Sequence, residues 1–417
     1  MLEQRVVITG IGTVCPTGIG VEEFSSAAFN GTKGRIEVFQ DRRGNNNQRF
    51  LVNRQRLEEE RKKLHKLHDG CNVRPRSLDS IKSSFVASHL ALSDSGLIND
   101  SRTKLQEQDR ESTSVFYSVP PEFKNIEKYF SDINFGVQRH LAEDVGSYVS
   151  TELSRIFGAE GISRAINACC SSTLNCIDDA IRYLKDGSSE IALCGSADMS
   201  YTSMTEGFDD FGILASENDE YRPMDESNKG LRIGDGAGSL VLETLGHAKA
   251  RDATDKIYAE VLASASYSDA SDRTKPSGLG LERSINSTLR KAELKPEQIS
   301  FVQVHGSGNK ASDEIEIATL KKIFGEHFKR LLVTSNKSRY GHSMINAGFY
   351  NLAELALSLK NSKPTPTVGV TRPRDADLNL ANLTTQANDK YKYGIALSMG
   401  FGGVNNCVLM KKWNPDY

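Results

Sequence analysis

The chain has 417 residues, enough for two or three domains or for one large duplicated domain with a sizeable core. This length excludes a small disulfide scaffold, and the share of hydrophobic residues, 38%, with 25% charged residues, argues against a disordered chain. The 52 Lys and Arg residues nearly balance the 54 Asp and Glu residues, so the net charge of −2 provides no global attraction to nucleic acid.

The sequence predicts a cytoplasmic protein with no membrane partner. No run approaches the ~18–20 apolar residues of a membrane span, and the N-terminus MLEQRVVITGIG lacks a basic region that leads into an apolar one. Seven cysteines, an odd number in a long chain, do not form a disulfide framework and are expected to be reduced thiols. They are Cys15, Cys71, Cys169, Cys170, Cys176, Cys194 and Cys407.

The chain opens in the manner of a nucleotide-binding fold. Residues 5–9 predict a buried strand and residues 21–30 a helix, with a loop that contains Gly10 and Gly12 between them. Cys15 stands where the dinucleotide fingerprint needs its third glycine. We therefore expect a tight turn from strand to helix and no nucleotide site.

Two further segments precede the middle of the chain. Residues 54–66 are rich in Arg, Glu and Lys, which is typical of a solvated helical face or a covering insertion, with docking of a partner as the alternative. Apolar residues recur at helical spacing from 78 to 97, and Gly96 suits the end of a helix. We expect this second segment to be a helix packed on the core.

A cysteine lies between a predicted strand, residues 164–168, and a predicted helix that ends near Gly187. Cys169 thus precedes the first helical turn, where unpaired N–H groups and the positive end of the helix dipole stabilise a thiolate or hold an oxyanion. The alternative is an inert buried thiol that packs as a small hydrophobe. Further strands are predicted at residues 190–194 and 240–242.

Two histidines in the second half of the chain lie in glycine-bearing loops. His305 follows the predicted strand 300–304, and His342 ends the polar segment 336–342. Ligands of α/β sheets bind at the carboxyl ends of strands, so we expect both side chains near a site, with a structural role as the alternative. The glycine-rich turn at residues 400–403 predicts a hairpin between two strands.

The cysteines and histidines do not have the spacing of a metal site. Cys169, Cys170 and Cys176 form no Cys-x2-Cys pair, and neither His305 nor His342 belongs to a His-x3-His or His-Glu-x2-His arrangement. The basic segments lack interleaved aromatic residues and any helix-turn-helix or RNA-recognition signature. We therefore expect no metal and no nucleic-acid partner.

Five separated motifs run from Arg5 to about Met410. They are VVITGIGTVCPTG at the start, NACCSS around Cys169, RPMDESNKGLRIGDGAG at 222–238, HGSGNKASDEIE at 305–316 with NKSRYGHSMINAG at 336–348, and SMGFGGVNN at 398–406. Together, and in this order, they resemble the β-ketoacyl-acyl carrier protein synthases of the thiolase superfamily, in particular the type II enzymes of fatty acid and polyketide synthesis.

The resemblance implies an α/β fold, the duplicated αβαβα five-layer sandwich of the thiolases. Residues 1–250 would form the half that carries the cysteine, and residues 251–417 the half that carries the two histidines. The stretch around 35–160 matches the family poorly, and we expect an insertion there with an unusual dimer surface. Because the family normally works as a dimer, a homodimer or a heterodimer with a chain-length-factor-like subunit is expected.

The resemblance also implies roles for residues at matching positions. Cys169 would be the nucleophile that takes an acyl group from a carrier-protein thioester, with His305 and His342 as its histidine partners. Lys337 would order the network around the histidines. Glu316 and Asp313 would support that network. Phe401 would be an aromatic gate, and its N–H would form an oxyanion hole with the N–H of Cys169. Ser307 and Asn309 would lie beside the malonyl carboxylate.

The implied reaction is that of a 3-oxoacyl-[acyl carrier protein] synthase, whose partners are the acyl and malonyl forms of the carrier protein. Malonyl carrier protein would lose CO2, and the resulting carbanion would attack the acyl group on Cys169. Two neutral imidazoles would stabilise the enolate, and a thiolate at a helix terminus suits acyl transfer. No metal, nicotinamide or flavin cofactor is required, because decarboxylation drives the reaction.

Departures from the family pattern leave other functions open. Ser307 and Asn309 replace threonines, which keeps open a malonyl carrier protein decarboxylase that only primes chains. Asn351 stands where many elongating enzymes have Glu, although Glu354 lies on the same helix face. Retention of the cysteine, histidines and lysine argues against a non-catalytic chain-length-factor-like partner. The position of Cys407 beyond the glycine-rich turn argues against a CoA-dependent thiolase.

Overall fold

The computed structural model describes residues 4–40, 46–68, 73, 79–99, 101–120, 148–199, 202–216, 219–272 and 274–415. Cys71 and much of the expected insertion, including residues 121–147, lie outside the described residues. The six described cysteines are free thiols, as expected. Within the described ranges no helix is long and apolar enough to cross a membrane.

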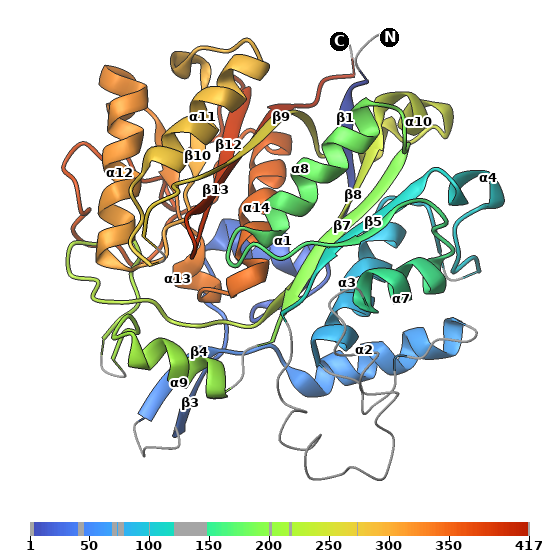
Figure 1. Ribbon diagram of the computed structural model, residues 1–417, viewed down its shortest axis with the longest axis horizontal. Helices are drawn as coiled ribbons and strands as arrows, with labels where there is room; N and C mark the ends of the chain where they lie inside the picture. The colour runs from blue at the N-terminus through green and yellow to red at the C-terminus, as the bar shows by residue number, and fades with distance from the viewer. Residues whose placement is uncertain are drawn as a thin grey trace.

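One mixed sheet runs through the molecule in two halves that have the same strand order (Figure 1). Counted along the chain within each half, the order across the sheet is first, fifth, fourth, second, third. In one half the strands are β1 (Val6–Cys15), β8 (Gly236–Thr244), β7 (Ile191–Asp198), β5 (Thr113–Ser118) and β6 (Ser163–Ala165). In the other they are β9 (Ala259–Ser268), β13 (Val404–Lys412), β12 (Tyr393–Gly400), β10 (Phe301–Gln303) and β11 (Leu332–Thr334).

The two halves meet where β1 pairs antiparallel with β9 at Val6–Ile8. The chain boundary expected at residue 250 falls in the connection between β8 and β9. The repeated strand order is what a duplication would leave, but the division at residue 250 itself stays a prediction.

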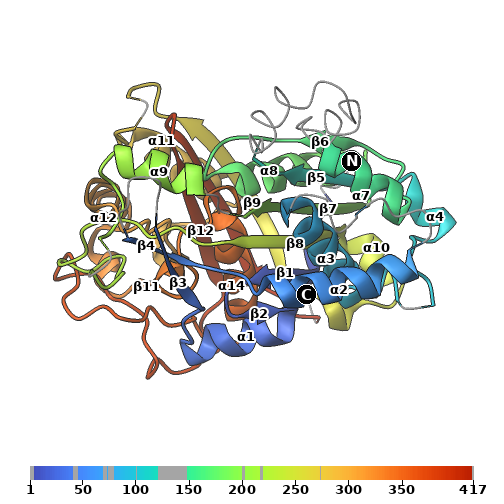
Figure 2. The ribbon, with the colours of Figure 1, turned by 90° about the horizontal axis from the view of Figure 1, so that it is seen from below.

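Helices form three layers around and between the half-sheets (Figure 2). The central pair is α8 (Ser172–Lys185) and α14 (Ala347–Lys360), which share one buried apolar cluster with both half-sheets. The outer pairs are α3 (Asp79–Asp94) with α7 (Tyr148–Phe157) on one side and α11 (Leu279–Lys291) with α12 (Lys310–Phe324) on the other. The predicted fold class, α/β with a duplicated five-layer αβαβα sandwich, is confirmed.

Shorter elements connect and cover these layers. Next to the sheet ends lie β2 (Gly18–Ile19), α1 (Val21–Asn30), α4 (Glu107–Arg110), α9 (Thr202–Asp210), α10 (Leu245–Ala250) and α13 (Lys337–Tyr340). Single 3-10 turns are η1 (Thr254–Lys256), η2 (Pro296–Gln298), η3 (Gly325–Lys329) and η4 (Met344–Asn346). The predicted helix at residues 21–30 is confirmed, and the helix predicted at 78–97 begins at the described residue Asp79 and ends at Asp94.

The loop predicted around Gly10 and Gly12 is wrong, because β1 continues through both residues to Cys15. A Cβ atom at Gly10 would lie 2.2 Å from the Ala91 carbonyl oxygen, and one at Gly12 would lie 1.9 Å from that of Ala87. The two glycines therefore let the backbone of α3 pack directly on the strand. Their role is to let α3 approach β1 closely, and the chain turns only after Cys15.

The segment at residues 54–66 forms a helix that packs on the body of the protein, which agrees with the prediction of a helical face or covering insertion. Helix α2 (Arg54–Leu67) buries Leu57 and Leu64, and Arg54 forms an ion pair of 3.0 Å with the fully buried carboxylate of Asp235. A hairpin that the sequence did not predict precedes it, formed by β3 (Ile36–Gln40) and β4 (Asn46–Phe50). The hairpin projects from the body beside α9 (Figure 1).

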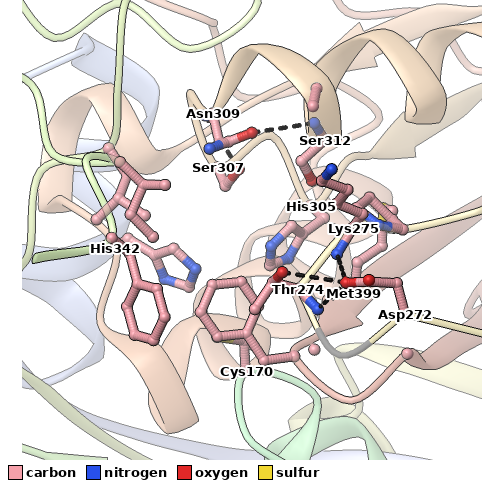
Figure 3. A pocket seen from close by; sticks show the side chains of 18 of the residues that line it. Cys170, Asp272, Thr274, Lys275, His305, Ser307, Asn309, Ser312, His342 and Met399 are labelled. Atoms are coloured by element: carbon pink, nitrogen blue, oxygen red, sulfur yellow. Dashed lines mark hydrogen bonds between the residues drawn. The ribbon is translucent and has the colours of Figure 1, made fainter. Parts of the chain in front are cut away.

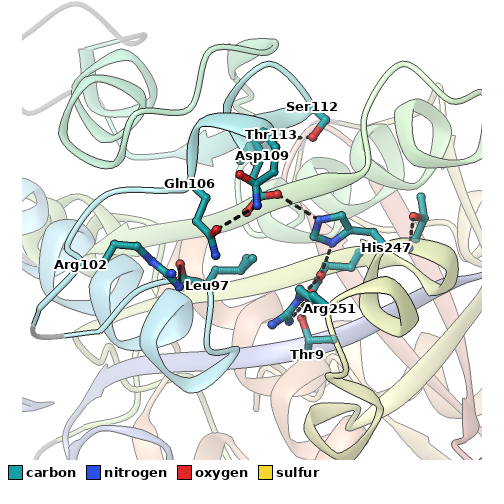
Figure 4. Close-up of polar contacts among 12 residues, drawn as sticks. Thr9, Leu97, Arg102, Gln106, Asp109, Ser112, Thr113, His247 and Arg251 are labelled. Atoms are coloured by element: carbon teal, nitrogen blue, oxygen red, sulfur yellow. Dashed lines mark hydrogen bonds and ion pairs between the residues drawn. The ribbon is translucent and has the colours of Figure 1, made fainter.

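A buried polar cluster ties the end of β8 to α10 and α4 (Figure 4). The Nδ1 atom of His247 lies 2.6 Å from Glu243 Oε2, and its Nε2 atom lies 3.4 Å from Asp109 Oδ1. Arg251 donates two hydrogen bonds to the same glutamate, whose side chain is fully buried. Burial lowers the pKa of His247, but the hydrogen bonds and charges of Glu243 and Asp109 outweigh it and raise the pKa above its usual value.

Because the pKa of His247 is raised, the contribution of this residue to the free energy of unfolding depends on pH. The charged imidazole is favoured in the folded state, so its contribution is fully present below about pH 6.5 and is lost as the pH rises through the folded-state pKa. We expect His247→Gln to cost about 1.5–3 kcal/mol of unfolding free energy near pH 6, the range for hydrogen bonds to charged groups. Urea titrations of both proteins should show that this cost shrinks towards pH 9; a constant cost would contradict the prediction.

Candidate active site

A strained turn presents Cys169 between β6 and α8. The φ angle of Cys169 is 51°, in the left-handed region that cysteine seldom adopts. The hydroxyl of Ser172 fastens the turn, because it accepts the Ala168 N–H at 2.8 Å and donates to the Cys169 carbonyl at 2.7 Å. The predicted strand is shorter than expected and ends at Ala165, and the helix begins at Ser172. Cys169 thus lies just before the N-terminus of a central helix.

The glycine-rich turn between β12 and β13 packs against this cysteine turn. A Cβ atom at Gly400 would lie 2.8 Å from the Ala168 carbonyl oxygen, so only glycine fits there. Ser171 Oγ donates to the Val404 carbonyl at 2.8 Å, and Ser398 Oγ donates to the Cys170 carbonyl at 2.7 Å. These contacts fix residues 400–403 beside Cys169, and the hairpin predicted there is confirmed.

The two adjacent cysteines have different surroundings. The Cys169 side chain is exposed, and its partial desolvation raises the pKa of the thiol, so the thiol is protonated at neutral pH. Cys170 is buried, and burial raises its pKa to about 12. The Cys169 N–H makes one long hydrogen bond, 3.3 Å, to Asn167 Oδ1, so an oxyanion at this position would compete with that side chain.

His305 follows β10 and is held through its backbone. Glu316 on α12 accepts the His305 N–H at 2.6 Å and the Gly306 N–H at 2.8 Å. Asp313, one turn earlier, accepts the Gly308 N–H at 3.1 Å, and burial raises the pKa of its carboxyl to about 6. The two carboxylates thus hold the loop that carries His305 from one helix.

The imidazoles of His305 and His342 lie edge to face, with ring centroids 5.2 Å apart and an angle of 77° between the ring planes. Burial, with the charge of Lys337 as a further cause, lowers the pKa of both well below 6.5, so both rings are neutral at neutral pH. His342 Nδ1 accepts the Met344 N–H at 3.2 Å, which leaves its Nε2 with the proton. Among the described residues, His305 Nδ1 has no hydrogen-bond partner.

Lys337 lies behind the histidines in a fully buried position at the start of α13. Its ammonium group donates to the His305 carbonyl oxygen. Burial lowers the pKa of Lys337, while Glu316 opposes that shift. Lys337 therefore fixes the His305 loop and supplies the positive charge that helps to keep both imidazoles neutral.

A cavity of about 260 Å³ opens beside the two histidines (Figure 3). Its apolar lining residues include Phe208, Phe211, Ile213, Leu231, Met344, Met399 and Phe401. Its polar lining residues include Asp269, Asp272, Thr274, Lys275, Ser307, Asn309, Ser312 and Asn405. Cys170 lines this cavity, whereas Cys169 is not among the lining residues and has an exposed side chain.

Apart from Cys169, which is not among the residues that line the cavity, the predicted site residues fall into two groups by position. Those that line the cavity are His305, His342, Ser307, Asn309 and Phe401. Those that lie behind it in the network are Lys337, Glu316 and Asp313.

The departures from the family pattern have structural roles here. Asn309 Oδ1 caps α12 by accepting the Ser312 N–H at 3.3 Å, and Ser307 Oγ accepts the Asn309 N–H at 3.2 Å. Asn351 Nδ2 donates to the Val304 and Leu397 carbonyls and so links the residue after β10 to β12.

Sequence reasoning missed residues that support the histidine loop from outside. Tyr221 donates to the Ser307 carbonyl at 2.7 Å, and Asn228 Nδ2 donates to the Gly308 carbonyl at 2.5 Å. Both lie in or beside the glycine-rich stretch 222–238, whose unusual glycine density was the available signal.

In the part of the chain that the structure describes, no group of three His, Cys, Asp or Glu residues could hold a metal ion.

Comparison with known proteins gives consistent matches over the whole chain. The profile of the family described as "Beta-ketoacyl synthase, N-terminal domain" matches residues 3–248, and that of "Beta-ketoacyl synthase, C-terminal domain" matches residues 258–371. The 3-oxoacyl-[acyl-carrier-protein] synthase 2 of Vibrio harveyi is 30% identical over 99% of both chains.

Solved structures match over the same extent. The ishigamide ketosynthase/chain length factor superposes with a TM-score of 0.85 at 25% identity, over 99% of this chain and 100% of that one. A ketosynthase solved in complex with its type II polyketide acyl-carrier protein superposes with a TM-score of 0.82 at 23% identity, over 99% of this chain and 100% of that one.

Proposed function

Because this chain belongs to the β-ketoacyl synthase family and is a condensing enzyme of the acyltransferase type, we propose that Cys169 is its acyl-accepting nucleophile and that His305 and His342 activate the malonyl donor. The observation that carries the proposal is the pair of neutral imidazoles, which line one cavity together with Cys170, the residue next to Cys169. The apolar lining residues suit an acyl chain, and the polar ones suit the amide groups of a pantetheine arm.

In the first step the Cys169 sulfur attacks the carbonyl carbon of an acyl thioester. The carbon–sulfur bond to the carrier breaks, and the thiol proton passes to the departing carrier thiolate. The N–H groups of Cys169 and Phe401 would stabilise the oxyanion, since Gly400 brings the two turns into contact. The thiol begins protonated, so a neutral imidazole nearby eases the transfer of its proton.

In the second step malonyl carrier protein loses CO2, and the electron pair of the broken carbon–carbon bond moves into the thioester as an enolate. Neutral imidazoles can each donate one N–H to the enolate oxygen. The enolate carbon then attacks acyl-Cys169, and the new carbon–carbon bond yields the 3-oxoacyl product. The cysteine leaves as a thiolate and is protonated from solvent.

The partners follow from the relatives. The solved ketosynthase with its acyl-carrier protein supports a carrier protein as donor, and the ishigamide ketosynthase/chain length factor supports a dimer, for which a homodimer and a heterodimer are both compatible. A cytoplasmic location remains a prediction of the sequence.

Intact-mass measurement of the purified protein tests the nucleophile. We expect an acyl adduct on the wild type after incubation with an acyl carrier protein, and its discharge as a 3-oxoacyl product when malonyl carrier protein is added. Cys169→Ser should form no thioester adduct that hydroxylamine cleaves. Cys170→Ser is the matched control because Cys170 is the adjacent thiol and lines the cavity, and it should retain the adduct.

Two outcomes would contradict the proposal. An adduct that survives in Cys169→Ser but disappears in Cys170→Ser would make Cys170 the nucleophile. Loss of CO2 from malonyl carrier protein by a wild type that forms no acyl adduct would favour the decarboxylase that only primes chains.

A further inference from the structure

One hydrogen bond joins the turn that carries the proposed nucleophile to the turn that carries one of its histidine partners. Thr173, in the first turn of α8, donates its hydroxyl to the Ile345 carbonyl at 2.7 Å. Thr173 follows Cys169 by four residues, and Ile345 follows His342 by three. Among the described residues, no other hydrogen bond joins the cysteine turn or the first turn of α8 to residues 342–348. Thr173 thus supplies the direct polar link between the two turns.

This bond belongs to a buried polar network that spans three elements. Ser196 Oγ, on β7, lies 2.7 Å from Thr173 Oγ1 and 3.0 Å from Asn346 Oδ1. Asn346 is the last residue of η4 and directly precedes α14. The side chains of Thr173, Ser196 and Asn346 are all buried. Because a buried polar group is costly to leave without its partner, the network favours one relative position of the three elements.

The helices that begin at the two turns are in direct contact. A Cβ atom at Gly348, in the first turn of α14, would lie 2.4 Å from Leu174 Cδ1 and 3.3 Å from Thr173 Cβ. Glycine therefore lets the N-terminal turns of α8 and α14 approach closely. The hydroxyl of Thr173 reaches the Ile345 carbonyl across this contact.

The other anchors of the two turns lie on different parts of the fold. Serine hydroxyls hold the cysteine turn to the turn between β12 and β13, as described above. The backbone of His342 is held by the segment before β8 instead: its N–H donates to the Arg232 carbonyl at 2.7 Å, and its carbonyl accepts the Gly234 N–H at 3.1 Å. Without the Thr173 hydroxyl each turn would keep its own anchors, but no hydrogen bond would fix the separation between them.

We propose that Thr173 is a positioning residue whose hydroxyl sets the separation at which the enolate held by the histidines meets acyl-Cys169. The inference rests on the proposed function, in which the carbon–carbon bond forms between groups that these two turns hold. Decarboxylation needs the histidines and not the cysteine, so it tolerates a change in this separation. Formation of the carbon–carbon bond needs both turns in place, and a displacement of about 1 Å can slow such a step by about 10²-fold.

The test measures the amount of CO2 released per molecule of 3-oxoacyl product, with acyl and malonyl carrier proteins as substrates. An enolate that does not reach the acyl group takes a proton from solvent and leaves as acetyl carrier protein, so poor alignment raises this ratio. We expect a ratio near one for the wild type, about ten for Thr173→Val and near one again for Thr173→Ser, which restores the hydroxyl.

Thr288→Val is the matched control. Thr288 is also buried, and its hydroxyl donates to a backbone carbonyl on another element, that of Cys407, at 3.2 Å. The control should lose stability and keep the wild-type ratio. A ratio near one in Thr173→Val would overturn the inference even if both rates fall, because equal losses indicate only a weakened fold. An equal rise of the ratio in Thr288→Val would overturn it as well.

Ser196→Ala is the second variant if Thr173→Val does not fold. It leaves the bond between Thr173 and Ile345 in place and removes the hydroxyl that supports Thr173 from β7. The ratio of CO2 to product should rise above the wild-type value, by less than in Thr173→Val. An unchanged ratio in Ser196→Ala would overturn the inference.

Crystal structures separate this inference from the proposed function. Those of the wild type, Thr173→Val and Thr288→Val give the distance between Cys169 and the His342 ring without any turnover. A change of about 1 Å confined to Thr173→Val supports the inference even if the wild type is never acylated, in which case the proposed function fails alone. An unchanged distance in Thr173→Val would overturn the inference, and product formation by the wild type would then leave the proposed function intact.

Discussion

Replacing His305 with Ala is expected to reduce decarboxylation of malonyl carrier protein by about 10²–10³-fold, the cost of losing one donor to a developing oxyanion. Acylation of Cys169 should fall by no more than about tenfold, because proton transfer can still use the remaining imidazole. The physical reason is the neutral state of His305, whose pKa burial and Lys337 lower well below 6.5. A neutral ring can donate an N–H to the enolate oxygen without first losing a proton.

The decisive measurement compares the loss of rate in Cys169 acylation with the loss of rate in malonyl decarboxylation. Single-turnover acylation, followed by intact mass, and CO2 release, followed with labelled malonyl carrier protein, are compared for the same preparation. His305→Gln is the second variant, because its amide N–H can restore part of the lost donation and its volume limits the cavity left by truncation. Equal losses in both half-reactions, without rescue by glutamine, would mean that His305 has only a structural role.

The local residues of the candidate site were predictable because their chemistry is carried by short segments. Cys169 has a strand before it and a helix after it, and His305 follows a strand in a glycine-bearing loop. Such placements need only strand and helix periodicity to be recognised. The structure brings His305 and His342 together as the resemblance implied, while their catalytic roles remain predictions.

The features that sequence reasoning missed depend on contacts between distant segments. The sequence predicts a loop at Gly10 and Gly12, yet both lie in a strand against which α3 packs closely. Nothing within the first fifteen residues indicates that helix. The apolar lining of the cavity likewise combines Phe208 of α9 with Met399, near the end of β12. The support that Glu316 gives to the backbone of His305 is a tertiary contact of the same kind. Periodicity indicates an element, but it does not indicate what packs on it.

The segment that carries Lys337 and His342 is anchored by a completely buried ion pair. Arg339 Nη2 lies 2.7 Å from Glu354 Oε2, and both side chains are inaccessible to solvent. Arg339 Nη1 also donates to the Ala28 carbonyl at 2.7 Å, which ties the segment to α1. Glu354 further accepts the Tyr340 hydroxyl at 2.9 Å and the Thr365 hydroxyl at 2.6 Å. Both residues also have uncharged hydrogen-bond partners, but the direct contact between them brings the two buried charges together.

We therefore expect Arg339→Met to lower the free energy of unfolding by about 3–5 kcal/mol, because it leaves the Glu354 carboxylate buried without its cation. The double variant Arg339→Met with Glu354→Leu removes both charges and should recover most of that loss, since apolar side chains of similar volume can replace a buried pair. Urea titrations of the three proteins at neutral pH measure both changes. A single variant as stable as the wild type, or a double variant less stable than the single one, would contradict this account.

The buried pair also bears on activity, because Arg339 precedes His342 by only three residues. Condensation activity should therefore fall together with the stability of the single variant and return in the double variant. That result would link the fixed position of His342 to the buried pair.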